Sequence, residues 1–406
     1  MFPCSSRSLR SCTLPSEARS ESGTSSRSRT RRTWARLSPP PSPNPCRAIT
    51  EIAKKSARMA SLDFTAGSRL RTGRCALARP NLPTLPERGS TETRPERNKL
   101  TRKVAPRDAR AVRYDLPVSG PIDLDLTFSC GQAFRWVREG DAWRGIVGRT
   151  EFTVSLLDPG HLSIALVGKD PGREALVRYF RLDQNPLSWL DHAEELRALP
   201  GILPLFGLRL LEQDPWETLA SFISSAASNI RKIGRCVEGV ALRWGTPIPG
   251  SARNAFPSAA ELARARERTL RETGLGFRAP YLLETARKIA GMESPWDALR
   301  QAPYEEARAV LSDLPGVGPK IADCTLLFGL GRLEAYPVDR WIRRATLELA
   351  SRRKARDEEL TRWAARFGPG RGYVQMILFH LRRTQGPLPP LPRVAAPPRA
   401  RAKRIA

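Results

Sequence analysis

The chain has 406 residues and a formal net charge of +27, a length that allows two or three domains. The charge lies mostly at the two ends, because residues 1–113 hold 25 Lys and Arg against 8 Asp and Glu, and residues 387–406 hold 5 basic residues and no acidic one. The chain between them is only mildly basic, so nucleic-acid binding has to be inferred from motifs, and no apolar stretch reaches the length of a membrane span.

Residues 1–113 are predicted to form a disordered basic tail. They are rich in Arg, Ser and Pro, and they bury too little apolar surface to offset the entropy lost on ordering. Three interpretations compete: a basic arm that contacts nucleic acid, an organelle transit peptide, or translated upstream sequence with Met59 as the true initiator. The absence of an amphipathic pattern favours the third. Residues 387–406 are predicted to be a second, Pro/Arg-rich basic tail.

Residues 114–200 are predicted to form a domain built on a small antiparallel sheet. Apolar residues alternate or cluster in segments 133–137, 143–147, 152–156 and 162–166, with turn residues between them. Residues 201–386 are predicted to form a helical body, because apolar residues there recur every three to four positions. Helices are expected over residues 216–244, 259–272, 279–290, 304–314, 320–330, 339–350, 357–367 and 372–383. The fold class is therefore α+β.

The cysteines and histidines predict no metal site. Neither kind occurs in pairs at metal-ligand spacing between residues 114 and 386, where the chain has Cys130, Cys236, Cys324, His161, His192 and His380. Three thiols without a disulfide framework fit a reducing compartment.

Residues 314–319 (LPGVGP) predict a Gly-rich turn that leads into an apolar helix. Gly316 and Gly318 permit positive φ and close backbone approach on either side of Val317, and Pro319 falls near the first helical position. The unpaired N–H groups of a first helical turn favour an anion such as phosphate. The segment is either a hairpin that grips a DNA phosphate or a tight turn between packed helices, and short Gly motifs alone favour the second.

Lys320 and Asp339 are the candidate catalytic residues. Lys320 lies in the first turn of its helix, where its charge opposes the helix macrodipole, and its neighbours are apolar. Both conditions favour a neutral, nucleophilic amine; the alternative is a surface lysine that reaches solvent or phosphate. Asp339 begins another helix and is a preferred N-cap residue, a position that does not prevent a catalytic role.

Residues 314–339 resemble the hairpin, Gly/Pro-rich loop and catalytic Asp of the helix-hairpin-helix base-excision glycosylases, in particular the 8-oxoguanine DNA glycosylase/lyase branch. The resemblance extends over residues 121–386. It implies a bifunctional DNA glycosylase and AP lyase that flips 8-oxoguanine from duplex DNA, excises it through a Schiff base on Lys320 with Asp339 as the conserved carboxylate, and then nicks the strand by β-elimination.

The resemblance also implies the residues of a base pocket. Gly131, in the run SCGQAFRW, matches the glycine whose carbonyl accepts the N7–H of 8-oxoguanine. Gln375 and Phe379 lie on one helical face and match the residues that bind the Watson–Crick edge and stack on the base. Cys324 lies on the face of Lys320 and matches a cysteine that packs on the other side of the base.

Further positions concern the opposite base. Phe277 and Arg278 resemble the aromatic wedge and the arginine that reads the opposite cytosine. The segment SSAASNI departs from the family, because Ala227 stands where a gap-filling Asn is usual; Ser228 and Asn229 are the candidate substitutes. Trp341 stands where a His often follows the catalytic Asp.

The resemblance implies a monomer that acts on double-stranded DNA containing oxidised guanine, without a metal or organic cofactor and without a membrane. Such a protein is expected in the bacterial cytoplasm, at the nucleoid, or in the nucleus or an organelle of a eukaryote. Two alternatives remain: a glycosylase for another damaged base, or a non-catalytic helix-hairpin-helix DNA-binding protein. Lys320 argues against monofunctional alkylation-repair glycosylases, and the absence of a C-terminal four-Cys cluster argues against endonuclease III-like enzymes.

Overall fold

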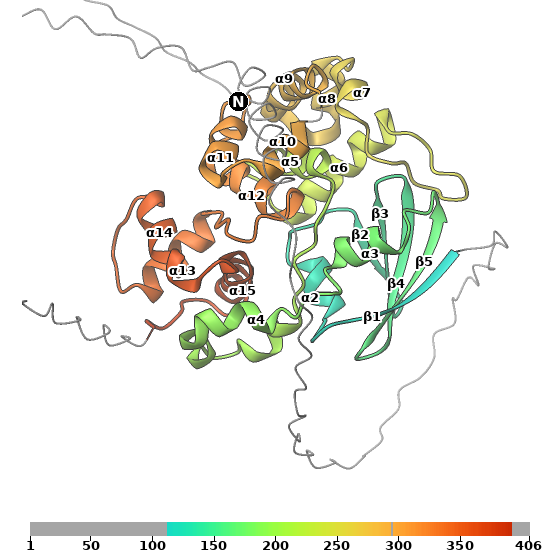
Figure 1. Cartoon of the computed structure of the whole chain (residues 1–406). Coiled ribbons are helices and arrows are strands. Elements are labelled where there is room, and N and C mark those ends of the chain that lie inside the picture. Colours follow the sequence, from blue (N-terminus) through green and yellow to red (C-terminus); the bar gives the residue numbers. More distant parts are fainter. Residues whose placement is uncertain (1–111, 294, 392–406) are drawn as a thin grey trace, which may run out of the picture. The chain divides into compact units, whose positions relative to one another are not determined.

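A computed structural model describes residues 112–293 and 295–391 of the chain (Figure 1). The first predicted tail lies outside the described residues except for residues 112 and 113. Of the second tail, residues 387–391 are described, and Leu388 and Leu391 are buried with the C-terminal helices. Within this part of the chain, no helix combines the length and the apolar character needed to cross a lipid bilayer. Nor do these residues contain a cluster of three or more His, Cys, Asp or Glu side chains that could hold a metal ion.

The N-terminal part is a five-stranded antiparallel sheet, which confirms the prediction. The strands follow the order β1-β5-β4-β3-β2, and their bounds are Val112–Pro117 for β1, Trp136–Glu139 for β2, Ala142–Val147 for β3, Thr150–Asp158 for β4 and His161–Gly168 for β5. Strands β2 to β5 follow one another through short turns, whereas β1 pairs with the distant β5.

Two helices cover one face of this sheet: α2 (Leu124–Ser129) and α3 (Arg173–Phe180) (Figure 1). Their aromatic side chains pack on the strands. The ring of Phe128 stacks on that of Trp136 with 3.9 Å between centroids, and Phe180 and Phe152 are fully buried in the same core. Burial of large aromatic side chains supplies much of the stability of so small a sheet.

Two hydrophobic cores organise the helical body. The larger core lies among α5 (Pro215–Ile223), α6 (Ile230–Trp244), α7 (Ala259–Ala263), α8 (Glu267–Leu270), α9 (Ala279–Ala290), α10 (Pro295–Gln301), α11 (Tyr304–Ser312) and α12 (Pro319–Gly329). The helix predicted over residues 216–244 is divided here into α5 and α6, because the chain turns at residues 224–229 and Ala227 takes a left-handed conformation with φ of +47°.

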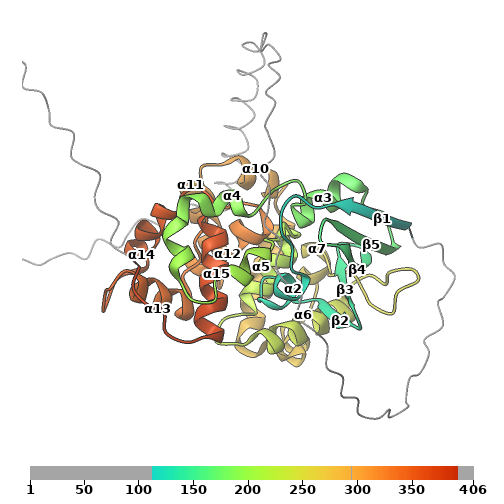
Figure 2. The ribbon, with the colours of Figure 1, turned by 90° about the horizontal axis from the view of Figure 1, so that it is seen from below.

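The second core joins the C-terminal helices to a segment that follows the sheet. It contains α13 (Arg340–Leu349), α14 (Asp357–Ala364) and α15 (Arg371–Thr384), together with α4 (Leu187–Leu190) and the 3₁₀ segments Asp191–Ala198 and Leu203–Gly207 (Figure 2). Leu196 and Leu199 are buried there beside Leu378. Residues 114–200, expected as one sheet domain, thus end in a segment that packs with the C-terminal helices.

Arg209 connects the sheet domain to the helical body. Its side chain is fully buried, and its guanidinium donates hydrogen bonds to five backbone carbonyl groups, those of Ser119, Gly120, Pro121, Arg181 and Gln184. Its own carbonyl accepts a hydrogen bond from Gln132 Nε2 at 2.7 Å. Only arginine offers five N–H donors in a fixed plane, so this one side chain holds three separate segments together.

We expect Arg209→Lys to lower the free energy of unfolding by about 2–4 kcal/mol, because an ammonium has three donors and leaves buried carbonyls unpaired, each costing about 1–3 kcal/mol. Urea unfolding followed by circular dichroism measures the change. Arg197→Lys is the matched control: Arg197 is exposed and forms an ion pair with Asp191 at 3.6 Å, so its change should stay below about 0.5 kcal/mol. Equal midpoints for the two variants would contradict the role of Arg209.

Candidate active site

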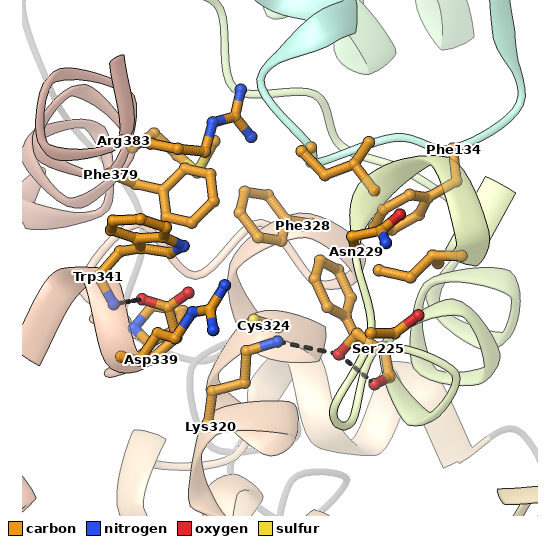
Figure 3. A pocket seen from close by; sticks show the side chains of 18 of the residues that line it. Phe134, Ser225, Asn229, Lys320, Cys324, Phe328, Asp339, Trp341, Phe379 and Arg383 are labelled. Atoms are coloured by element: carbon orange, nitrogen blue, oxygen red, sulfur yellow. Dashed lines mark hydrogen bonds between the residues drawn. The ribbon is translucent and has the colours of Figure 1, made fainter. Parts of the chain in front are cut away.

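A cavity of about 720 Å³ lies where the two helical cores meet the segment before β2. Figure 3 shows the side chains around it: Lys320, Cys324 and Phe328 come from α12, and Asp339, Trp341, Phe379 and Arg383 lie on one side, across from Phe134, Ser225 and Asn229. The full lining is Ser129, Gly131, Phe134, Phe222, Ser225, Ser228, Asn229, Ile230, Arg231, Ile233, Lys320, Cys324, Phe328, Pro337, Asp339, Arg340, Trp341, Gln375, Met376, Phe379 and Arg383. Seven of the candidate site residues selected from the sequence therefore line this cavity.

Lys320 enters the cavity from the first turn of α12. Pro319 begins this helix, and Gly318 precedes it without a side-chain cap. The Nζ atom of Lys320 donates a hydrogen bond to Ser225 Oγ at 3.1 Å (Figure 3) and lies 4.7 Å from the centroid of the Phe222 ring. The amine is therefore held at the cavity wall by one hydroxyl group and one aromatic face.

Asp339 caps α13, as predicted. Its carboxylate oxygen Oδ1 accepts hydrogen bonds from the backbone N–H groups of Trp341 and Ile342, both at 2.8 Å. These bonds fix the carboxylate at the positive end of the helix, where a negative charge is stabilised. The cap leaves the second oxygen, Oδ2, without any of these bonds, and Asp339 still lines the cavity that Lys320 lines.

Gln375 presents an unpaired acceptor in the cavity wall. The side chain is 4% exposed, and its Nε2 donates to the carbonyl oxygen of Pro337 at 3.2 Å. Its Oε1 atom is buried without a hydrogen-bond partner among the described residues. Because a buried unpaired acceptor costs about 1–3 kcal/mol, this atom points to a ligand that donates an N–H or O–H group.

Phe379 and Cys324 lie beside Gln375 in the lining. The ring of Phe379 lies 5.1 Å from the guanidinium carbon of Arg383. Burial raises the pKa of the Cys324 thiol to about 12, so the sulfur is a neutral, polarisable surface at physiological pH. Both residues therefore contribute apolar surface to the wall of the cavity.

At Gly131 the backbone itself lines the same cavity. Its φ is +95°, and a Cβ atom built there would lie 2.7 Å from Ile230 Cδ1 and 4.0 Å from the Phe379 ring. Any other residue would therefore be strained and would push into the cavity. The next residue, Gln132, fixes the loop, since its amide donates to Thr127 and Arg209 and accepts from Leu211 N at 2.9 Å.

The hairpin residues lie outside the cavity lining. Pro315 and Gly316 occupy the centre of a turn in which Val317 N donates to Leu314 O at 3.1 Å, and the φ of +72° at Gly316 is typical of the third position of a type II turn. Val317 is buried, whereas nothing lies within 4 Å of a Cβ built at Gly318. The turn therefore packs against the body and leaves the start of α12 open.

Of the opposite-base candidates Phe277, Arg278 and Asn229, only Asn229 lines the cavity. Phe277 is 54% exposed and Arg278 is 3% exposed, and neither lines the cavity. Asn229 does line it, but its side chain also caps α6 by accepting from Lys232 N at 3.0 Å.

Several lining residues were not selected from the sequence as site residues, notably Ser225, Phe222, Arg231 and Arg383. Ser225 stands in the SSAASNI segment, but nothing in its spacing indicates a contact with a lysine 95 positions later. Trp341, noted only as a departure from the family, lies in the cavity wall with its ring 5.1 Å from Arg340 and 5.8 Å from Arg344.

The strained turn at Ala227 predicts a stabilising substitution. Ala227 is exposed with φ of +47°, a conformation that costs a non-glycine residue about 1 kcal/mol or more. We expect Ala227→Gly to raise the free energy of unfolding by up to about 1 kcal/mol. Ala226→Gly, at a neighbour without positive φ, should instead lower it by about 0.5–1 kcal/mol. Thermal unfolding of the two variants checks the prediction, and a common sign for both would refute it.

Comparisons with known proteins agree with this geometry. Residues 115–219 match the family model described as 8-oxoguanine DNA glycosylase, N-terminal domain. An N-glycosylase/DNA lyase of Saccharomyces cerevisiae is 34% identical over 250 residues, 53% of this chain and 65% of the relative. A probable N-glycosylase/DNA lyase of Methanothermobacter thermautotrophicus is 36% identical over 203 residues, 44% of this chain and 65% of the relative. The chain thus spans somewhat less than two thirds of the length of these relatives.

Among solved structures, an 8-oxoguanine glycosylase/lyase of Clostridium acetobutylicum, in complex with double-stranded DNA containing cytosine opposite 8-oxoguanine, is similar with a TM-score of 0.59 and 28% identity. The similarity covers 65% of this chain and 92% of that one. The matched N-terminal domain, the related lyases and the similar arrangement of sheet and helices point in the same direction. The chain is similar to 8-oxoguanine DNA glycosylases and N-glycosylase/DNA lyases in its N-terminal domain and in its fold.

Proposed function

We propose that the protein is a bifunctional DNA glycosylase and AP lyase that excises 8-oxoguanine from duplex DNA. The observation that carries the proposal is the meeting of Lys320, Asp339 and the unpaired Oε1 of Gln375 in one cavity. Attack on a flipped nucleotide requires a nucleophile, a carboxylate and a buried hydrogen-bond acceptor. A DNA-binding protein without catalysis would have no use for this combination.

The chemistry begins with the amine of Lys320 in its neutral form. Its lone pair attacks C1′ of the flipped nucleotide, the bond between C1′ and the base nitrogen breaks, and the base leaves with the bonding electrons and takes up a proton. The carboxylate of Asp339, held by two backbone N–H groups, stabilises the positive charge that develops on the sugar. The nitrogen of the resulting adduct loses a proton, the C1′–O4′ bond breaks, and O4′ takes up a proton, which leaves an imine between Nζ and C1′. The imine acidifies C2′–H, and loss of that proton, with cleavage of the C3′–O bond, expels the 3′ phosphate.

Other residues that line the cavity would bind the flipped base. Flipping a base costs a few kcal/mol of unstacking, and stacking between Phe379 and the neutral sulfur of Cys324 offsets that cost. Gln375 Oε1 accepts a hydrogen bond from an N–H on the Watson–Crick edge. The carbonyl of Gly131 accepts from N7–H, a donor that 8-oxoguanine has and guanine lacks. Such a difference of one donor supports strong discrimination, because the wrong base leaves a buried acceptor unpaired.

The DNA on either side of the lesion would contact residues at the rim of the cavity and outside it. The open start of α12 at Gly318 suits a backbone phosphate, and the exposed ring of Phe277 suits insertion beside the vacated position. Arginines at the cavity, Arg231, Arg340 and Arg383, suit the flanking phosphates. The protein would act as a monomer on genomic DNA, in the nucleoid of a bacterium or in the nucleus or an organelle of a eukaryote.

The first test is covalent trapping. Borohydride should reduce the imine and give a stable protein–DNA adduct on a duplex with 8-oxoguanine opposite cytosine, and Lys320→Gln should abolish it because no amine remains. Denaturing gel electrophoresis measures the adduct.

Lys169→Gln serves as the matched control, since Lys169 is an exposed lysine after β5, outside the cavity lining. It should trap as the unchanged protein does. Absence of an adduct with unchanged protein, or an undiminished adduct with Lys320→Gln, would overturn the proposed function.

The second test separates recognition of the base from attack on the sugar. Gln375→Met keeps the side-chain volume but removes the acceptor, so excision of 8-oxoguanine should slow by about 10–100-fold, equivalent to the 1–3 kcal/mol of one buried hydrogen bond. Cleavage of an abasic duplex, which has no base to bind, should change less than about threefold.

Single-turnover kinetics on the two duplexes measure both rates. Gln301→Met, at the exposed end of α10 and outside the lining, should change neither. An equal loss on the 8-oxoguanine and abasic duplexes would show that Gln375 does not act through the base.

A further inference from the structure

We propose that Arg278 is a positioning residue that holds the 224–229 turn, and with it Ser225, against the amine of Lys320. This role differs from reading the opposite base, which the sequence resemblance implied for Arg278. The proposal rests on the proposed function, because it concerns the placement of the lysine that attacks the sugar.

The guanidinium of Arg278 uses three of its five N–H donors on backbone carbonyl groups. Nε donates to the carbonyl oxygen of Ala226, one terminal nitrogen donates to Ala227 O at 3.0 Å, and the other donates to Leu275 O at 3.1 Å. The side chain is 3% exposed, and its guanidinium carbon lies 4.4 Å from the Phe277 ring. All three nitrogen atoms are therefore committed to backbone, and one face is covered by an aromatic ring.

A base-reading role would have to move this side chain. Bidentate recognition of a base edge requires two donors, and the two N–H groups that remain on Arg278 belong to a side chain that is only 3% exposed. Bringing them to a base would require release of the backbone bonds and would leave buried carbonyl groups unpaired. The same release would free the 224–229 turn. Apart from the bond that Ser225 accepts from Lys320, the other described bonds of this turn are short-range ones such as Ser228 N to Ser225 O at 3.2 Å.

The turn needs an external support because it contains a strained residue. Ala227 has φ of +47°, and the two carbonyl groups that Arg278 binds are those of Ala226 and Ala227 themselves. The residue before this pair, Ser225, accepts the hydrogen bond from Lys320 Nζ at 3.1 Å. A chain of contacts thus runs from Arg278 through the turn to the attacking amine.

This arrangement predicts how substitution changes the rate with each opposite base. If Arg278 positions Lys320, its loss slows attack whatever base stands opposite the lesion. If it reads cytosine, its loss slows attack opposite cytosine and spares the other three pairings. The ratio of the four rates separates the two roles, whereas a rate on one duplex alone does not.

The experiment measures single-turnover excision of 8-oxoguanine opposite C, A, G and T with protein in excess, so that the rate constant does not depend on the fraction folded. Arg278→Gln should lower all four rate constants about tenfold or more and leave their ratios within about twofold, as expected for loss of one well-positioned contact. Arg278→Lys should recover part of the loss. Arg268→Gln, an exposed arginine of α8 outside the lining, should change none.

A double-mutant cycle tests whether Arg278 acts through Ser225. Ser225→Ala should lower the rate of covalent trapping on abasic DNA, and adding Arg278→Gln should cost much less than it does alone, because both changes remove the same contact. Additive losses, or a loss confined to the duplex with cytosine, would overturn the positioning role. An unchanged protein that excises from none of the four duplexes would overturn the proposed function together with it.

Discussion

The described structure depends most on the burial of one charged side chain, Arg209. A guanidinium shielded from solvent is stable only when its donors are hydrogen-bonded. Here it is bound by five carbonyl groups from two segments of the sheet domain, residues 119–121 and 181–184. The carbonyl of Arg209 in turn binds Gln132, which fixes Gly131 at the cavity. The wall that would discriminate the oxidised base is therefore supported by the same contact that joins the sheet to the helices.

Helix starts supply the reactive groups. Lys320 lies in the first turn of α12, and Asp339 caps α13. A rigid helix fixes the direction of a side chain better than a loop does, and the unpaired N–H groups of its first turn hold the Asp339 carboxylate in place. The exception is Ser225, which lies on a turn with a positive φ at Ala227, and this turn accepts hydrogen bonds from Arg278. The two proposed catalytic groups at helix starts and one hydroxyl group on a turn thus share the cavity.

Sequence patterns predicted which helices and strands form better than they predicted the residues at which these begin and end. Apolar periodicity identified the sheet and most helices, and α9 begins and ends where it was predicted. The prediction of one long helix over residues 216–244 was wrong at its centre. The small residues at 224–229 do not interrupt the apolar pattern, but the backbone turns there. Periodicity reports which face is buried, not whether the backbone stays helical between two buried faces.

The sequence by itself determined the Gly-rich turn before α12, the N-cap position of Asp339 and the placement of Gln375 and Phe379 on one helix, because local spacing and residue type carry that information. Only the tertiary structure decided which of these residues meet. Seven selected residues line one cavity, whereas Arg278, an arginine that local sequence allows to contact a base, is buried on three backbone carbonyl groups. The bonding partners of an arginine are set by segments far away in the chain, and no local pattern encodes them.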